Sequence, residues 1–297
     1  MSKQLSDAMQ PVPRAMIERS RPIWVALGVL IIAASFVILD SQLLRAAGDP
    51  HVIADFSGYW VRPESGRDRI YYQPESGPGP IVIADDAGDY MIGDYSDPIL
   101  LPHAAEAVRA HGDQGRAGVV LYPPWSLCWP AGVPLALNMA EPVQILQTED
   151  QVTILYQRGQ QIRRIDLNRK HPENIAPSWY GHSVGHYEGD DTLVIDTIAQ
   201  DTRSEVDRFG TPRSDAMRVV ERYRVAEDRQ SLTIEFMVED PKTFTTPWSA
   251  RTGYVPLAAG DEDERSGSQF TEVICSENNR DAAGGDFPIP VGSTRAF

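Results

Sequence analysis

The second half of the chain alternates apolar and polar residues with the two-residue period of β-strands. The clearest example lies between residues 231 and 238, where every second residue is apolar: Leu232, Ile234, Phe236 and Val238. Successive side chains of a strand point to opposite faces of a sheet, so this pattern predicts a sheet with one buried face. Segments of this kind, separated by short turns, predict strands at 143–147, 151–156, 161–166, 183–187, 192–197, 217–225, 231–238, 249–257 and 269–276.

No helical crossover lies between these segments, which argues against an α/β fold. The expected fold is mainly β: an antiparallel up-and-down barrel or a strongly curved sheet, lipocalin-like in architecture, because closure removes exposed strand edges. Proline and glycine are frequent in the segment before the barrel, which is expected to cover it and to contain one helix at 104–112. The predicted divisions are a cytoplasmic tail (1–22), a transmembrane anchor (23–44), a linker (45–54), the covering segment (55–140), the barrel (141–279) and a tail (280–297).

An uninterrupted apolar run at residues 23–39 has about the length that crosses a bilayer. Basic residues precede it, among them Arg19 and Arg21, and they favour a cytoplasmic N-terminus. The chain is therefore expected to be a single-pass inner-membrane protein whose C-terminal domain lies in the periplasm. A cleaved signal peptide is the alternative, because small residues follow the run at Ala46 and Ala47.

Charge and motifs narrow the set of partners. The 297 residues include 27 basic and 42 acidic side chains, and the net charge of −15 argues against nucleic acid or anionic lipid surfaces. No phosphate-binding loop, dinucleotide fingerprint or zinc motif is present in the sequence, so no cofactor is expected. The expected partners are the inner membrane, a small apolar molecule and, as an alternative, a protein of an envelope complex.

Residues 182–197 form a predicted hairpin that carries two histidines. Turn residues at 188–191 would make its loop, so that His182 pairs with Thr197. This register places His182 and His186 together on one largely apolar face. On a helix that spacing would suit zinc, but on a strand the two Cα atoms are ~13 Å apart, so no metal site is expected.

The candidate catalytic residues are His182, Glu221 and Asp196, because an imidazole beside a carboxylate can act as a general acid or base. Glu221 is the only charge on its face of a predicted strand, so a barrel that buried this face would direct it towards a common interior with His182. In the alternative, His182 is a hydrogen-bonded core residue, and Glu221 faces water while Arg222 or Arg224 lies inside.

Aromatic residues near these positions are the candidate ligand-binding side chains, because such rings can line an apolar pocket. Together with one histidine they are Trp179, Tyr180, His186, Tyr223 and Trp248. Tryptophan is also an ordinary core residue, and several tryptophans of this chain adjoin proline. Packing within a plug is therefore the alternative interpretation.

Several strings together resemble a family of exported bacterial proteins of uncharacterised activity. They are DFSGYW (55–60), CWPAGVP (128–134), PVQILQT (142–148), PSWYGHSVGHYEGDDTLVIDT (177–197), VVERYR (219–224), DPKTFTTPW (240–248) and CSEN (275–278). The resemblance spans roughly residues 55 to 279 and implies no particular reaction. The family usually has arginine and tryptophan in place of His186 and Tyr187, and one acidic residue fewer in the turn that follows, so His186 is a weaker candidate than His182.

The chain has two cysteines, Cys128 and Cys275, and both lie in the part expected outside the cytoplasm. An oxidising compartment permits a disulfide between them, and two buried thiols are the alternative. The resemblance implies a cysteine at both positions, which favours the disulfide.

Three functions are consistent with these features. The first is a membrane-anchored periplasmic barrel that binds a small apolar molecule. The second is an enzyme that uses a histidine and a carboxylate for hydrolysis, dehydration or isomerisation. The third is a structural subunit of an envelope complex.

Overall fold

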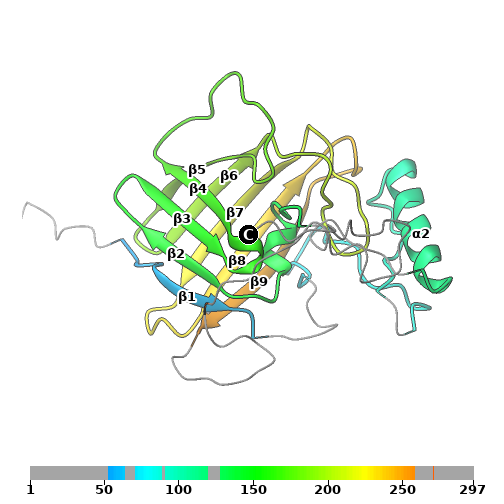
Figure 1. Cartoon of the computed structure of the whole chain (residues 1–297), viewed down its shortest axis with the longest axis horizontal. Coiled ribbons are helices and arrows are strands. Elements are labelled where there is room, and N and C mark those ends of the chain that lie inside the picture. Colours follow the sequence, from blue (N-terminus) through cyan, green and yellow to red (C-terminus); the bar gives the residue numbers. More distant parts are fainter. Residues whose placement is uncertain (1–52, 64–70, 89–90, 120–127, 258–269, 271–297) are drawn as a thin grey trace, which may run out of the picture. The chain divides into compact units, whose positions relative to one another are not determined.

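A computed structural model describes residues 53–63, 71–88, 91–119, 128–257 and 270. Its main element is a closed barrel of nine strands (Figure 1). The strands are β1 (Gly58–Val61), β2 (Val143–Gln147), β3 (Gln151–Tyr156), β4 (Gln161–Leu167), β5 (His182–Glu188), β6 (Thr192–Ile198), β7 (Arg218–Val225), β8 (Leu232–Glu239) and β9 (Trp248–Pro256). The described helical segments are α2 (Pro102–Arg116) and the 3-10 turns η3 (Leu135–Asn138) and η4 (Arg158–Gln160).

The mainly β prediction and the barrel are confirmed. Strands β2 to β9 correspond to the eight predicted segments from 143–147 to 249–257, with ends within one residue. The helix expected at 104–112 is α2, which is longer at both ends. The ninth predicted strand, 269–276, lies outside the described residues except for Phe270.

The ninth strand of the barrel comes from the segment that was expected only to cover it. Strand β1 pairs with β2 through Gly58↔Ile145 and Trp60↔Val143 and with β9 through Val61↔Val255. Four residues are too few to give a clear alternation, so the pattern did not reveal this strand. The predicted boundary between a covering segment and a barrel is therefore wrong at β1.

The barrel is not purely antiparallel, because β4 and β5 run parallel. They pair at only three positions, from Ile165↔Ser183 to Leu167↔Gly185, whereas β4 pairs with β3 over six. A parallel pair requires a long connection, which residues 168–181 supply. Gly185 permits this pairing, because a Cβ there would lie 2.9 Å from Cγ2 of Ile165. The first half of β4 consequently diverges from the chain that leads into β5.

The pairing of β5 with β6 differs from the predicted register by one residue. The observed partners include Glu188↔Thr192, Ser183↔Thr197 and His182↔Ile198. Glu188 belongs to the strand, so the loop consists of residues 189–191. A shift of one residue changes the face of every side chain relative to the neighbouring strand. His182 and His186 therefore lie on the outer face of the barrel.

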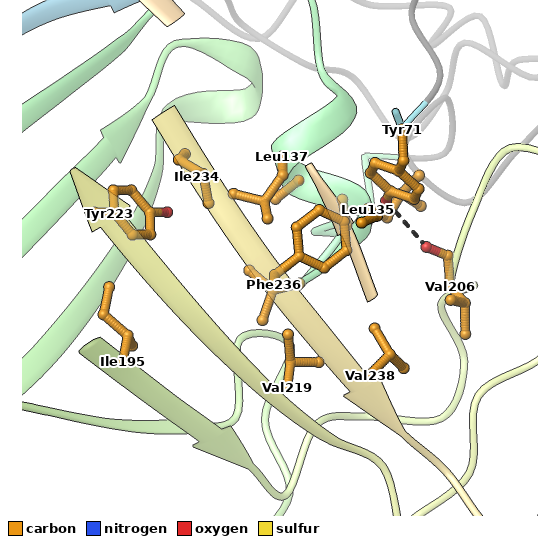
Figure 2. Close-up of a cluster of buried hydrophobic side chains, with 14 of the residues drawn as sticks. Tyr71, Leu135, Leu137, Ile195, Val206, Val219, Tyr223, Ile234, Phe236 and Val238 are labelled. Atoms are coloured by element: carbon orange, nitrogen blue, oxygen red, sulfur yellow. Dashed lines mark hydrogen bonds between the residues drawn. The ribbon is translucent and has the colours of Figure 1, made fainter. Parts of the chain in front are cut away.

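The interior next to β8 is filled by side chains, including those of a segment that enters from outside the sheet. Leu135 and Leu137 of η3 are almost fully buried. In Figure 2 they lie beside Phe236, while Ile195 and Tyr223 lie on the inner side of neighbouring strands. Inward-facing residues of β7 and β8 complete this apolar cluster: Val219, Tyr223, Ile234, Phe236 and Val238.

Hydrogen bonds to the β6–β7 connection hold the segment that leads into η3. Gln200 binds the backbone of Val133 twice, because its Nε2 donates to the carbonyl and its Oε1 accepts from the N–H, each at 2.8 Å. Ser204 Oγ donates to the carbonyl of Ala131 at 2.8 Å, and Arg213 donates to the same oxygen. These contacts tie residues 131–133 to the β6–β7 connection and position η3 in the barrel interior.

Several predictions concern residues outside the described ranges. The apolar run at 23–39 is one of them, and the described part of the chain contains no helix long and apolar enough to cross a bilayer. Cys128 is described and is not a free thiol, whereas its predicted partner Cys275 is not described. The anchor and the Cys128–Cys275 bridge therefore stay predictions.

Candidate functional site

A cleft of about 490 Å³ lies on the outer wall of the barrel where β4 and β5 diverge. One wall is the first half of β4, with Gln161, Ile162 and Arg164, and the other is the chain around Trp179 and His182. Because the two strands pair only from Ile165 onward, the opening is a direct consequence of their divergence. Most of the remaining lining residues are polar: Arg163, Asp166, Ser178, Tyr180, Gly181, Ser183 and Pro130.

Gly181 sets the position of His182 at the entrance to β5. Its φ of +64° lies in the left-handed region, and a Cβ there would lie 2.2 Å from the carbonyl oxygen of Ile198. Its N–H donates to the carbonyl of Ser178 at 3.0 Å, which closes a tight turn. Glycine is required here because the backbone both adopts a positive φ and passes directly against β6.

His182 belongs to a row of ionisable side chains on the outer surface. Its Nδ1 lies 2.9 Å from Nδ1 of His171, a residue of the β4–β5 connection. Nε2 of His171 lies 3.5 Å from Oδ2 of Asp196 on β6, which is a charge contact too long for a good hydrogen bond. Asp196 is held by Arg218 of β7, whose Nε and Nη2 each donate to it at 2.8 Å. Burial lowers the pKa of His171, although Asp196 opposes this effect.

An aromatic and cationic stack supports the opposite end of the same wall. The guanidinium of Arg203 lies 4.3 Å from the ring centroid of Trp179 and 5.6 Å from that of Trp129. The two tryptophan rings are 5.5 Å apart. Asp201 accepts two hydrogen bonds from Arg203 Nε and Nη2, at 3.0 and 2.6 Å, and so fixes the cation. Trp179 in the cleft wall therefore contacts both a cation and a second aromatic ring.

A polar network lies inside the barrel, on the other side of the same strands. Arg163 and Glu221 are almost completely buried and form an ion pair, with Nη1 donating to Oε1 at 3.0 Å. Arg163 also donates to Ser183 Oγ at 3.1 Å and to Thr197 Oγ1 at 2.7 Å, and Tyr223 donates to Glu221 at 3.1 Å. Burial lowers and Glu221 raises the pKa of Arg163, and the net shift is well upward. The network gives both members of the buried charge pair several hydrogen-bond partners.

The three candidate catalytic residues separate into these two environments. Glu221 faces inward, as its apolar neighbours predicted, but its partner is Arg163. His182 faces outward, so the expected shared interior site of His182 and Glu221 is wrong. The cause is the one-residue difference in the β5–β6 register. Asp196, also on the outer face, lies in the His182 row through His171.

The candidate ligand-binding residues divide in the same way. Trp179 and Tyr180 line the cleft together with His182. Tyr223 and Trp248 are each 2% exposed and belong to the interior cluster. His186 lies on the outer face, where its Nε2 is 3.6 Å from Glu188.

Two residues of the site, Arg163 and His171, were not predicted from the sequence. Arg163 shares its strand face with the polar Gln161 and the apolar Ile165 and Leu167, so the alternation indicates an inward charge there less clearly than at Glu221. This weaker signal could have suggested the pairing of the two residues. His171 lies in an irregular connection, where no periodicity indicates what it contacts.

The described residues contain no group of three or more metal-ligating side chains placed to hold an ion. Comparison with models of known protein families found no match, and a search of curated proteins found no relative. The resemblance to exported bacterial proteins therefore stays a prediction.

Proposed function

We propose that this protein is a membrane-anchored periplasmic barrel that binds a small molecule in the cleft between β4 and β5. The observation that carries the proposal is the cleft itself, whose volume of about 490 Å³ falls within the range typical of small-molecule sites. Trp179 and a group of polar side chains in its walls support it further.

The lining indicates an amphipathic ligand more than a purely apolar one. Trp179 and Ile162, the latter 48% exposed, offer apolar surface for a ring or a short chain. Arg164, Gln161 and His182 offer charged and hydrogen-bonding groups beside it. A ligand inside the barrel is less well supported, because η3 and the apolar cluster of β6 to β8 occupy that part of the interior.

The binding proposal is tested with two matched tryptophan variants of the full-length protein. Ile162→Trp would fill the cleft, and Leu146→Trp would add the same ring at an outer-face position of β2 that is 43% exposed. Native mass spectrometry of the purified wild type should detect a co-purified mass that Ile162→Trp loses and Leu146→Trp keeps. An identical spectrum for all three proteins would show that the cleft does not bind the ligand.

An enzyme acting through His182 is the second candidate function. It is favoured by the position of His182 in the cleft wall and by its contact with His171, which gives an imidazole a defined orientation at a place where a substrate could lie. The carboxylate that would assist is Asp196 rather than Glu221. A co-purified compound that the protein converts, and that His182→Ala no longer converts, would favour this function over simple binding.

The location proposal rests on the apolar run at 23–39 and its basic flank. Membrane fractionation should recover the full-length chain with the inner membrane, and non-reducing peptide mapping should recover Cys128 and Cys275 as one linked peptide. A soluble product that begins near Ala46 would instead show a cleaved signal peptide. Two alkylatable thiols in freshly isolated protein would disprove the bridge.

A further inference from the structure

The row formed by Asp196, His171 and His182 constrains where protons are located. Two imidazole nitrogens 2.9 Å apart cannot both carry a proton, so one Nδ1 donates and the other accepts. The contact alone does not say which. The surroundings of His171 on its other side decide the direction.

Asp196 favours a proton on Nε2 of His171, because its Oδ2 lies 3.5 Å from that nitrogen and carries negative charge. Nε2 of His171 is buried and makes no hydrogen bond, so Asp196 is the polar group that this nitrogen faces. With the proton on Nε2, a neutral His171 has its lone pair on Nδ1. Burial lowers the pKa of His171 and thus favours the neutral ring. His171 then accepts a hydrogen bond from Nδ1 of His182.

We propose that Asp196 and His171 act as positioning residues that hold His182 in its Nδ1–H tautomer, so that Nε2 of His182 offers a lone pair to the cleft. This inference rests on the proposed role of the cleft as the binding site. It adds the chemical class of the ligand: a molecule with an O–H or N–H group that donates to Nε2. In a reaction, the same nitrogen would act as a general base.

The proton transfer balances without a further reactant. A ligand O–H bond breaks, its electron pair stays on the oxygen as an anion, and its proton binds Nε2 of His182. The Nδ1 proton of His182 stays hydrogen-bonded to Nδ1 of the neutral His171, so the positive charge lies on His182. The charged groups on the neighbouring strands are Arg218 on β7, which is paired with Asp196, and Arg164 and Asp166 on β4, which line the cleft together with His182.

Long-range proton–nitrogen NMR of the full-length protein, labelled with ¹⁵N in histidine, identifies the tautomer of each ring without a ligand. At a pH where the rings are neutral, His182 is expected as the Nδ1–H form and His171 as the Nε2–H form. His186 is the internal control, because it lies on the same strand and face but is 55% exposed in its side chain and has no imidazole neighbour among the described contacts. It should show the Nε2–H form, which free imidazole side chains prefer and which Glu188, 3.6 Å from its Nε2, also favours.

Two variants separate positioning from simple packing. His171→Phe removes the acceptor and should return His182 to the tautomer of His186. His171→Gln keeps an acceptor oxygen within reach and should retain the Nδ1–H form. An Nε2–H form of His182 in the wild type, or a tautomer that His171→Phe leaves unchanged, would overturn the proposal.

The result of the tautomer experiment can be told apart from the result of the binding test. If Ile162→Trp leaves the co-purified ligand in place, the cleft proposal fails whatever the tautomer of His182. If that variant abolishes binding but His182 is the Nε2–H form, the cleft stands and the positioning role is wrong.

Discussion

The two polar clusters on opposite sides of the β4–β6 wall differ in burial and therefore in what they can do. The inner cluster is closed to solvent: Arg163 and Glu221 are 1% and 0% exposed, and Arg163 makes hydrogen bonds to several inner side chains. In the outer row His171 and Asp196 retain 17% and 24% exposure, and His182 borders an open cleft. The comparison teaches that charge alone does not mark a functional site. Access to a ligand matters as well: the inner cluster borders the cleft through Arg163 and Ser183, which are 1% and 4% exposed, and Glu221 does not line it.

The largest expected effect comes from breaking the inner ion pair. Glu221→Gln would leave Arg163 buried without a counter-charge, and removing one partner of a buried pair typically costs about 3–5 kcal/mol of stability. Urea unfolding of the full-length protein measures this loss. The matched control is Glu188→Gln on the outer face, which removes the exposed partner of Arg222 and should change stability little. Equal losses for both variants would contradict the distinction drawn between the two faces.

Removing both inner charges sharpens the same test. A double variant with Arg163→Met and Glu221→Met leaves no unpaired charge inside the barrel. It should therefore recover much of the stability that Glu221→Gln loses. Continued loss in the double variant would show that the hydrogen bonds to Ser183 and Thr197, and not the charge balance, hold this part of the barrel.

A smaller effect is expected at the turn that positions His182. Gly181→Ala adds left-handed strain of about 1–2 kcal/mol and a clash with the backbone of Ile198, for which overpacking typically costs a further ~1–3 kcal/mol. Gly189 is the control, because its φ of +63° matches and the nearest atom to an added Cβ is 4.0 Å away. Gly189→Ala should therefore show the strain alone. The free energy of unfolding is measured for both variants. Equal losses in Gly181→Ala and Gly189→Ala would refute the role of close packing at Gly181.

The smallest effect is the pH dependence that the outer row contributes. The folded-state pKa of His171 lies below its ordinary value of 6.5, so the unfolded chain binds the proton more tightly. Stability from this residue is therefore complete above about pH 6.5 and is lost as the pH falls below it. Unfolding measured between pH 8 and pH 5 should give a shallower acid slope in His171→Gln than in the wild type. His186→Gln serves as the control. An acid slope that is unchanged in His171→Gln would show that His171 does not contribute to the pH dependence of stability.

Local pattern determined most strands of this protein. Alternation within a few residues identified β2 to β9, because each strand must present one apolar face wherever it lies in the sheet. The same pattern marked Glu221 as an inward charge, and it gave a weaker indication at Arg163, whose face also carries the polar Gln161. Strand β1 was missed because four residues carry too little pattern, and it is defined by its pairing with β2 and β9.

The site could be predicted only in part. Trp179, Tyr180 and His182 are close in sequence, and the structure places all three in the lining of one cleft. The cleft itself arises because β4 and β5 are parallel and diverge, which no local pattern encodes. His171 joins the site from an irregular connection, so its contact with His182 depends on the path of that connection over the barrel.

The sequence by itself determined the strands β2 to β9 and which of their residues are apolar. Tertiary structure decided the face to which His182 belongs, because a two-residue period makes a one-residue change of register reverse every side chain of a strand. The loop between β5 and β6 has three residues, whereas four were predicted. Because of this one-residue difference, His182 contacts His171 on the outside of the barrel and not Glu221 in the interior. Leu193 and Ile195 lie inside under either register, so the register decides whether His182 or Ser183 joins them, and Ser183 does so as a hydrogen-bond partner of Arg163.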